Sequence, residues 1–327
     1  MIICRTPFRI SFFGGGTDFP AWYKNEGGAV ISTTINKYCY INIRQLPRFF
    51  SFKYRIRYFK TEQTRRLQDI KHPSFREALK LLNFQNDSIE IVHNADLPAL
   101  SGMGASSSAT VCLLHAAYAL RNLNVTKKKL SLNSLEVEQK ILKEFVGSQD
   151  QISTAYGGFN HIQFNQNSSF EVKPISNKKN IKKIEKSIVL IFTGLQRKAQ
   201  IIEKDKIKNM NINRSFLSEI NSITNEALSM INQNLDIKKF GELLNYQWNL
   251  KKKLSRNVSN KVIDEIYSNG LRCGAYGGKL LGAGNGGFIL FICNEDVKKK
   301  IYKKFKSFLF IPIKFDTHGS QIIYPKK

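Results

Sequence analysis

The stretch from Leu97 to Val111 reads LPALSGMGASSSATV, and it stands between a strand-like run and an apolar helical run. The first run covers residues 88–94 and the second covers residues 109–120. Glycines and serines therefore lie where a helix begins, and a helix N-terminus presents unpaired N–H groups that attract anions. For an isolated turn, a helix start rich in capping residues is the simpler interpretation. Two more glycine-rich stretches favour a phosphate-binding loop, because small residues let phosphate oxygens approach the backbone.

The first of these stretches follows an N-terminal strand and reads FFGGGTDFP over residues 12–20. Three consecutive glycines add no packing volume, but they permit unusual backbone angles and close approach by a ligand. Asp18 comes directly after them, and a carboxylate beside an open turn suits bidentate hydrogen bonding to vicinal sugar hydroxyls. The alternative is an aspartate that caps a helix beginning at Pro20, and Asp18 alone would favour it.

The second stretch reads KLLGAGNGG over residues 279–287 and leads into an apolar strand. Packing does not require so many glycines in so short a segment. They indicate a loop that lies against another loop or against phosphates.

Length and composition describe a globular chain of two domains. The 327 residues are 42% hydrophobic, which is enough for two cores of ordinary size. The chain has no uncharged apolar run of membrane-spanning length and no secretory signal, so we expect no membrane association. Its five cysteines are scattered and lack metal-ligand spacing, which is typical of reduced thiols in a cytoplasmic protein.

The formal net charge of +26 raises the question of nucleic-acid binding. The lysines are spread over many segments, and no zinc-finger spacing, aromatic RNA-binding motif or basic tail accompanies them. We therefore expect no nucleic-acid partner and favour a small, phosphorylated substrate. Candidate cations for its phosphate are Arg197, Lys198 and a basic strand face that carries Arg55 and Arg57, although a solvated sheet face explains that strand equally well.

Strands and helices are mixed along the chain, which predicts an α+β fold. Strand patterns cover the N-terminus and residues 28–43, and helical patterns dominate residues 199–254. The lysine-rich segment 165–186 is predicted to be a hairpin and linker. We place the domain boundary there, giving domains of residues 1–175 and 176–327.

The order and spacing of the three glycine-rich stretches resemble the GHMP kinase superfamily, which includes galactokinase, homoserine kinase and mevalonate kinase. Its central motif resembles Pro-x-x-x-Gly-Leu-Gly-Ser-Ser-Ala, and residues 98–107 read PALSGMGASS. Leu100 replaces a usual small residue, and Ala105 replaces the usual first serine. Within the superfamily, RTPFRISFFGGGTD at residues 5–18 and GSQDQ at residues 147–151 look most like kinases of D-glycero-D-manno-heptose 7-phosphate. Fucokinase-type domains share a related first turn.

This resemblance implies a ribosomal-protein-S5-like N-terminal domain, a ferredoxin-like C-terminal domain, and ATP and Mg²⁺ as cofactors. The residues implied to bind the ATP phosphates are Gly102, Met103, Gly104, Ala105, Ser106, Ser107, Ser108, Gly282 and Gly284. Ser106 and Glu138 are implied to bind magnesium, with Ser107 as a second hydroxyl that can assist, whereas the neighbouring Glu136 is given no role. The implied substrate residues are Gly15, Gly16, Thr17, Asp18 and Arg197.

Asp150 is implied to be the catalytic base, whereas a simple turn aspartate is the alternative interpretation. Arg9 occupies a place where several relatives have lysine. Arginine stays protonated, so it can stabilise charge but cannot carry a proton, which leaves Asp150 as the base.

The implied reaction is phosphorylation of heptose 7-phosphate at the anomeric O-1, which yields the 1,7-bisphosphate and ADP. Three alternatives stay open: another sugar 1-kinase of the fucokinase or galactokinase type, a non-catalytic ligand sensor, and a basic nucleic-acid-binding protein. No residue indicates the oligomeric state, and a homodimer is kept as a hypothesis.

Overall fold

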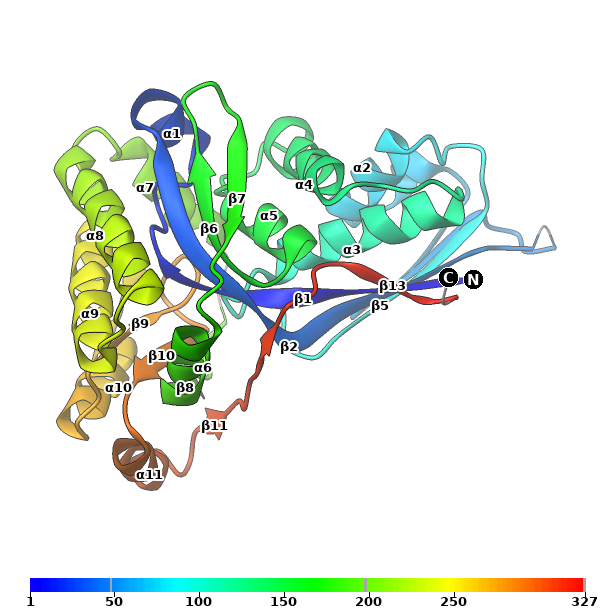
Figure 1. Ribbon diagram of the computed structural model, residues 1–327. Coiled ribbons are helices and arrows are strands. Elements are labelled where there is room, and N and C mark those ends of the chain that lie inside the picture. The colour runs from blue at the N-terminus through cyan, green and yellow to red at the C-terminus, as the bar shows by residue number, and fades with distance from the viewer. Residues whose placement is uncertain (48, 197–198, 326–327) are drawn as a thin grey trace.

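The computed structural model describes residues 1–47, 49–196 and 199–325, and it contains a larger and a smaller sheet (Figure 1). The main path of the larger sheet has the strand order β13-β1-β2-β5-β3-β4, and β6, β7 and β12 join it through β2. Its strands are β1 (Ile2–Phe13), β2 (Gly28–Gln45), β3 (Tyr54–Arg57), β4 (Thr61–Thr64), β5 (Ile89–Ala95), β6 (Phe159–Phe164), β7 (Phe170–Pro174), β12 (Phe315–Asp316) and β13 (Gln321–Tyr324). The smaller sheet has the order β11-β8-β10-β9, with β8 (Ile188–Phe192), β9 (Gly277–Leu280), β10 (Phe288–Ile292) and β11 (Leu309–Phe310).

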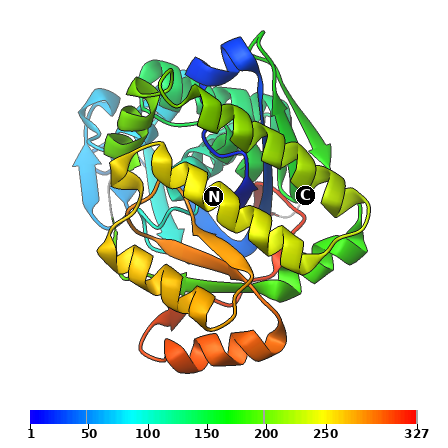
Figure 2. The same cartoon turned by 90° about the vertical axis from the view of Figure 1, so that its left-hand side faces the viewer.

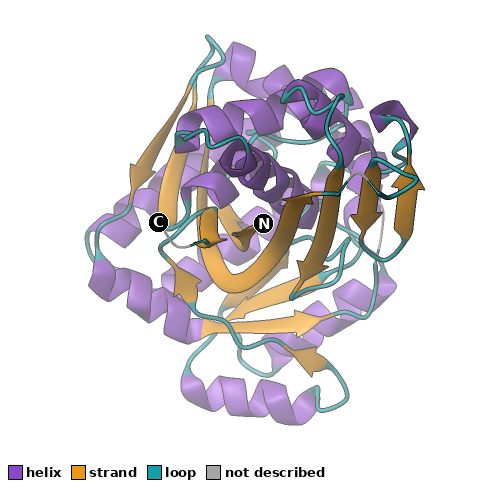
Figure 3. Cartoon of the chain, turned by 90° about the vertical axis from the view of Figure 1, so that its right-hand side faces the viewer, coloured by secondary structure: helices purple, strands orange, loops and turns teal. Residues whose placement is uncertain are grey.

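Helices cover both sheets. The α-helices are α1 (Pro20–Glu26), α2 (Pro73–Leu81), α3 (Ala105–Leu120), α4 (Lys127–Leu135), α5 (Gln149–Tyr156), α6 (Lys178–Ser187), α7 (Ala199–Lys208), α8 (Arg214–Asn232), α9 (Ile237–Lys253), α10 (Lys261–Arg272) and α11 (Glu295–Lys304). Short 3₁₀ turns cover Leu67–Asp69 and Arg256–Val258, and a π-helix covers Glu136–Ile141. The larger sheet curves around a group of helices (Figure 3), and α8 and α9 run side by side at one end of the molecule (Figure 2).

Helix α3 is the central helix, and its sequence explains its place. It is apolar on nearly all sides, and such a helix must be buried. It packs against β1 and β2, the two long strands at the middle of the larger sheet. The phosphate-loop candidate at its N-terminus is thereby held against β1, where the backbone N–H of Arg9 donates to the carbonyl of Met103.

The two sheets are not separated by a single cut of the chain. The strands β1 to β7 belong to the larger sheet and β8 begins the smaller one, but β12 and β13 return to the larger sheet and pair with β2 and β1. The main hydrophobic core also joins the two parts, since the ring of Phe240 on α9 packs against the rings of Phe12 and Phe13 on β1. The C-terminal half is therefore docked firmly on the first sheet.

The predicted α+β fold is confirmed, whereas one local expectation was wrong in part. The lysine-rich segment expected to be a hairpin and linker carries β7 of a hairpin, but it also contains α6, because Asn177 caps the backbone N–H of Asn180 and Ile184 is buried. Helix α4 continues directly into the π-helix that carries Glu138.

Candidate active site

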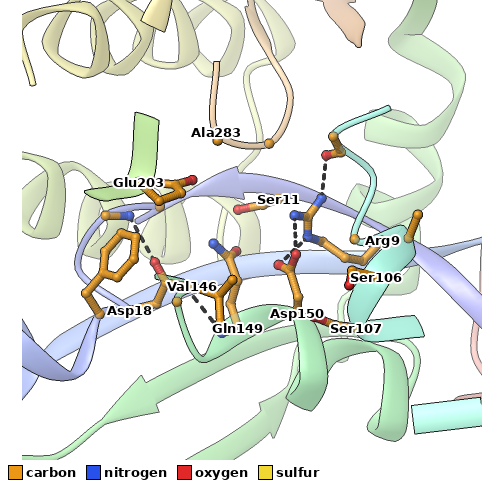
Figure 4. A pocket seen from close by; sticks show the side chains of 18 of the residues that line it. Arg9, Ser11, Asp18, Ser106, Ser107, Val146, Gln149, Asp150, Glu203 and Ala283 are labelled. Atoms are coloured by element: carbon orange, nitrogen blue, oxygen red, sulfur yellow. Dashed lines mark hydrogen bonds and ion pairs between the residues drawn. The ribbon is translucent and has the colours of Figure 1, made fainter. Parts of the chain in front are cut away.

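One cavity collects residues from all three glycine-rich stretches (Figure 4). Asp18 and Glu203 lie at one end, and Ser106 and Ser107 lie at the other, with Gln149 between them. The first and central stretches stand on β1 and α3 beside the larger sheet, while the third belongs to the smaller sheet. The cavity therefore forms where the two sheets meet.

The third glycine-rich stretch lies directly against the central one, as its composition predicted. A Cβ atom at Gly102 would come within 2.7 Å of the carbonyl oxygen of Leu281, and one at Gly282 would come within 2.5 Å of the Gly102 Cα. Gly287 would likewise approach the carbonyl oxygen of Ser101 at 2.2 Å. Real Cβ atoms do not tolerate such distances, so glycine is required for the contact between the two loops.

Helix α3 begins at this contact. Gly104 is its N-cap residue and has a φ of 76°, a left-handed conformation that favours glycine. Ala105, Ser106 and Ser107 form the first turn and line the cavity. The unpaired N–H groups of the turn, together with the helix dipole, make this end of the cavity an anion site.

Arg9 and Asp150 form a bidentate ion pair beside the helix start (Figure 4). The Nε and Nη2 atoms of Arg9 each donate to an Asp150 carboxylate oxygen at 2.7 Å, and its Nη1 donates to the carbonyl of Gly102 at 2.9 Å. The Arg9 side chain is 5% exposed, whereas that of Asp150 is 24% exposed. Arg9 thus holds the Asp150 carboxylate in one orientation, and the carboxylate is accessible from the cavity.

Glu138 lies behind this end, on the π-helix, and is completely buried. Its Oε2 accepts hydrogen bonds from Ser107 Oγ at 2.8 Å and Gln151 Nε2 at 2.5 Å, while Oε1 has no partner within the described chain. Burial raises the pKa of Glu138 to about 7. A buried carboxylate with an unused oxygen beside a serine hydroxyl fits a hard cation such as Mg²⁺, which prefers oxygen ligands and few protein groups.

The serine that contacts Glu138 is Ser107. Ser106, the serine implied by the motif, lines the cavity one position earlier but is more exposed. Successive helical residues point about 100° apart, so the two hydroxyls point in different directions, and Ser107 is the one that contacts Glu138.

Asp18 closes the other end of the cavity and does not cap α1, whose N-cap residue is Phe19. Its Oδ1 accepts from the backbone N–H of Gly16 at 3.0 Å, and its Oδ2 accepts from that of Gln149 at 3.3 Å. A Cβ atom at Gly147 would lie 1.9 Å from Oδ2, so the glycine makes room for the carboxylate. Burial raises the pKa of Asp18 to about 6.

Three lysines of the C-terminal half also line the cavity, and sequence reasoning did not single them out. Lys206, Lys251 and Lys279 are 7%, 6% and 3% exposed. Lys206 donates to Glu203 and to the carbonyl of Ala283, and Lys251 donates to the carbonyls of Leu280 and Gly282. No motif contains Lys206 or Lys251. Lys279 is the first residue of the third glycine-rich stretch, but it was not predicted to be a site residue.

Several predicted site residues do not line the cavity. Thr17 is buried and donates to the carbonyls of Gly14 and Ala29, and Ser108 donates to the carbonyl of Pro7. These hydroxyls hold the loops in place. Met103 is a core residue, and Gly284 packs against Val258.

Four basic residues were proposed to bind a substrate phosphate, and the structure describes two of them, Arg55 and Arg57. Arg55 and Arg57 pair with Glu90 on the neighbouring strand and do not line the cavity. Their strand face is thus an ion-pair network outside this cavity, which does not support the phosphate-edge hypothesis. Arg197 and Lys198 lie outside the described residues. The remaining predicted residues, namely Arg9, Gly15, Gly16, Asp18, Gly102, Gly104, Ala105, Ser106, Ser107, Asp150 and Gly282, line the cavity together.

Polar atoms without partners also indicate a polar ligand. Within the described chain, the Oγ atoms of Ser11 and Ser101 and the Oε1 atom of Gln149 are buried and make no hydrogen bond, and all three residues line the cavity. Buried polar groups are rarely left unsatisfied. A ligand rich in hydroxyls or phosphate oxygens would supply their partners.

Known proteins resemble this chain in sequence and in fold. The model of the GHMP kinases N terminal domain matches residues 73–158, and that of GHMP kinases C terminal matches residues 226–310. D-glycero-alpha-D-manno-heptose 7-phosphate kinase from Campylobacter jejuni is 29% identical over 312 residues, which cover 91% of each protein. Galactokinase from Pyrococcus furiosus is 23% identical over 337 residues, which cover 92% of this chain and 91% of the relative.

Solved structures share the fold of this chain. A D-glycero-D-manno-heptose 1-phosphate kinase from Bacteriodes thetaiotaomicron superposes with a TM-score of 0.82 and 23% identity, covering 100% of both chains. A putative sugar kinase from Campylobacter jejuni superposes with a TM-score of 0.73 and 26% identity, covering 98% of both chains.

The described helices include none that combines the length and apolar character needed to cross a membrane.

Family models match both the N-terminal and the C-terminal part of the chain, and the glycine-rich stretches that carry the resemblance meet in one cavity. The chain therefore belongs to the GHMP kinase family and is an ATP-dependent sugar kinase.

Proposed function

We propose that the protein transfers the γ-phosphoryl group of ATP to the anomeric O-1 of D-glycero-D-manno-heptose 7-phosphate. The observation that carries the proposal is the placement of the accessible Asp150 carboxylate between the anion site at the start of α3 and the carboxylate of Asp18. The similarity to a heptose 7-phosphate kinase along 91% of the chain supports the choice of substrate.

Asp150 acts on the acceptor hydroxyl. Phosphoryl transfer depends mainly on positioning and on stabilising negative charge. The bidentate contact with Arg9 holds Asp150 in one orientation, with one edge exposed to the cavity. As the sugar O-1 forms its bond to phosphorus and the bond to the ADP oxygen breaks, Asp150 accepts the hydroxyl proton. Arg9 keeps its own proton, and its positive charge stabilises the negative charge on the transferred phosphoryl group.

The ATP phosphates bind at the loop between β5 and α3. The backbone N–H groups of Gly104, Ala105 and Ser106 supply donors there, and the packing of Gly282 against Gly102 shapes the loop. Ser107 and Glu138 would hold the magnesium ion, which when bound neutralises phosphate charge and orients the phosphoryl group. The free Oε1 of Glu138 is the protein atom that this assignment uses.

Asp18 binds the sugar at the opposite end. Both of its oxygens are fixed by backbone N–H groups, yet each carboxylate oxygen has a second lone pair for a sugar hydroxyl. Gln149 stands between Asp18 and Asp150, and its unpartnered Oε1 offers an acceptor to a hydroxyl in the middle of the sugar. A sugar bound by these groups would have one end at Asp150.

The test is magnesium-dependent ADP release with a panel of acceptors: heptose 7-phosphate, the unphosphorylated heptose, fucose, galactose and mevalonate. We expect turnover with heptose 7-phosphate, and phosphorus NMR of the product should show a new phosphate on the anomeric carbon. Turnover with fucose or galactose in preference to the heptose phosphate would retain the kinase and reject the substrate. A product phosphorylated elsewhere would reject the assignment of O-1.

A further inference from the structure

The cavity is lined by more cationic side chains than the proposed catalytic step requires. In the described part of the chain it is lined by four cationic side chains and three carboxylates: Arg9, Lys206, Lys251 and Lys279, and Asp18, Asp150 and Glu203. Arg9 is committed to Asp150. The three lysines are each more than nine-tenths buried, and burying an ammonium group is costly unless an anion accompanies it.

One of these lysines, Lys206, reaches the sugar end of the cavity, which Asp18 and Glu203 line. Lys206 lies one turn after Glu203 on α7, and Figure 4 places Glu203 beside Asp18, away from Ser106 and Ser107. Lys206 also lines a small hollow that adjoins the cavity, together with Gly16 and Phe19 of the first glycine-rich turn. Its ammonium group donates to the carbonyl of Ala283, so it lies between the first and the third glycine-rich stretches.

Lys279 stands on β9, lines the same cavity and donates to the carbonyl of Phe12 on β1 at 2.8 Å. Burial, and after it the positive charges of Arg9 and Lys206, lower its pKa to about 7, while Asp18 acts in the opposite direction. An anion bound between Lys206 and Lys279 would favour the protonated form of Lys279.

Both ammonium groups have donors to spare. An ammonium group has three N–H donors. Within the described residues, Lys206 donates to Ala283 and Glu203, at 2.7 and 3.0 Å, and Lys279 donates to the carbonyl of Phe12 at 2.8 Å. Lys251, by contrast, binds two carbonyls of the third glycine-rich stretch and serves the loop itself.

Resting on the proposed function, we propose that Lys206 and Lys279 bind the phosphate that the sugar substrate already carries. The phosphate ester would lie at the end of the sugar opposite the hydroxyl that Asp150 activates. Such a site distinguishes a sugar phosphate from a free sugar, and Lys206 is its specificity-determining residue.

The experiment compares Lys206→Met, Lys279→Met and Lys208→Met with the wild type. Lys208 is exposed on the same helix and does not line the cavity, so it is the matched control. KM and kcat are measured for heptose 7-phosphate, for the unphosphorylated heptose and for ATP. Thermal unfolding of each variant shows whether it is folded.

Loss of a charge-assisted hydrogen bond should raise the KM for heptose 7-phosphate by about 10–100-fold in Lys206→Met. The KM for ATP and the kcat/KM for the unphosphorylated heptose should stay within about twofold, so the preference for the phosphorylated sugar is lost. Lys206→Arg should retain most of that preference. An equal rise in KM for ATP, or equal losses for both sugars, would overturn the inference and leave Lys206 as a support of the third glycine-rich stretch.

Inorganic phosphate provides a test on the wild type alone, which stands even if a variant does not fold. It should inhibit competitively against heptose 7-phosphate at saturating ATP, whereas inhibition that is competitive only against ATP contradicts the inference. A wild type that prefers an unphosphorylated sugar would reject the proposed function itself. A wild type that prefers heptose 7-phosphate, with a Lys206→Met variant that keeps this preference, would reject the phosphate site alone.

Discussion

The two ends of the cavity are built in different ways. At the catalytic end, side chains hold side chains, since Arg9 clamps Asp150 and Ser107 donates to Glu138. At the sugar end, the carboxylate of Asp18 is held by backbone N–H groups, and the nearby lysines donate mostly to backbone carbonyls. The side chains of the proposed catalytic end are thus held mainly by one another. The charged side chains of the sugar end keep hydrogen-bonding capacity that a substrate can use.

The comparison predicts its largest effect at Asp150. Asp150→Asn should lower kcat by about 10³-fold, because the amide cannot accept the hydroxyl proton and leaves the buried Arg9 without its counter-charge. Steady-state kinetics with saturating substrates measures this loss. The exposed Asp264→Asn is the control and should retain wild-type kcat. A loss of less than tenfold in Asp150→Asn would show that Asp150 only positions the acceptor.

Glu138→Gln should have the next largest effect, a loss of about 10²-fold in kcat with a higher magnesium requirement. The glutamine oxygen can still accept from Ser107 and Gln151, but the amide nitrogen at the place of Oε1 cannot bind a cation. Glu136→Gln, two residues away in the same π-helix, is the matched control. Magnesium titrations at fixed ATP distinguish the two variants, and identical curves would remove Glu138 from the metal site.

Asp18→Asn tests the sugar end, where the effect should fall on binding. Loss of hydrogen bonds to a charged group should raise the KM for the sugar by about 10–100-fold. The KM for ATP should stay unchanged, and kcat should fall by less than about threefold. If kcat falls as far as in Glu138→Gln, the two ends of the cavity do not divide binding from chemistry as the geometry indicates.

A smaller effect concerns stability and pH. The pKa of Glu138 is raised by burial from an ordinary value of 4.5 to about 7, so the folded state holds this proton more tightly than the unfolded state. The free energy of unfolding contributed by this group is therefore greatest below about pH 4.5, falls as the pH rises, and is lost above about pH 7.

Without magnesium, Glu138→Gln should consequently unfold at a higher temperature than the wild type at pH 8, by about 2–5 °C. The difference should shrink toward pH 5, where Glu138 is protonated in the folded protein. Thermal unfolding followed by circular dichroism across this range checks the sign. A variant that is less stable than the wild type at pH 8 would show that the ionised carboxylate is satisfied without a cation.

The comparison also separates what the sequence predicts from what it does not. The residues of the proposed catalytic end could be named from the sequence because they stand in short local patterns, such as the glycine–serine turn before α3 and the GSQDQ turn that contains Asp150. The sequence does not indicate which of Ser106 and Ser107 contacts Glu138, because this depends on the rotation of α3 relative to the buried Glu138.

The sugar end could be predicted only in part, because Asp18 belongs to a glycine-rich motif whereas Lys206 does not. Lys206 lies on a helix without a motif, in a chain with 51 lysines and arginines, so no local signal marks it. Its place in the cavity arises only when that helix packs beside the first glycine-rich turn. The return of β12 and β13 to the larger sheet was hidden for a similar reason, since strand pairing over such a separation leaves no trace in local periodicity.

The smallest effect should come from the basic strand that sequence reasoning offered as a phosphate site. Arg57 is about half exposed and reaches Glu90 at 3.3 Å, while Arg44 and Arg55 contact the same carboxylate at 2.5 and 2.6 Å. Exposed ion pairs contribute little, and here two cations remain to neutralise Glu90. Arg57→Gln should therefore change the KM for heptose 7-phosphate by less than about twofold, in the assay in which Lys206→Met raises it. A rise as large as that of Lys206→Met would return the substrate phosphate to this strand, outside the cavity that holds Asp150.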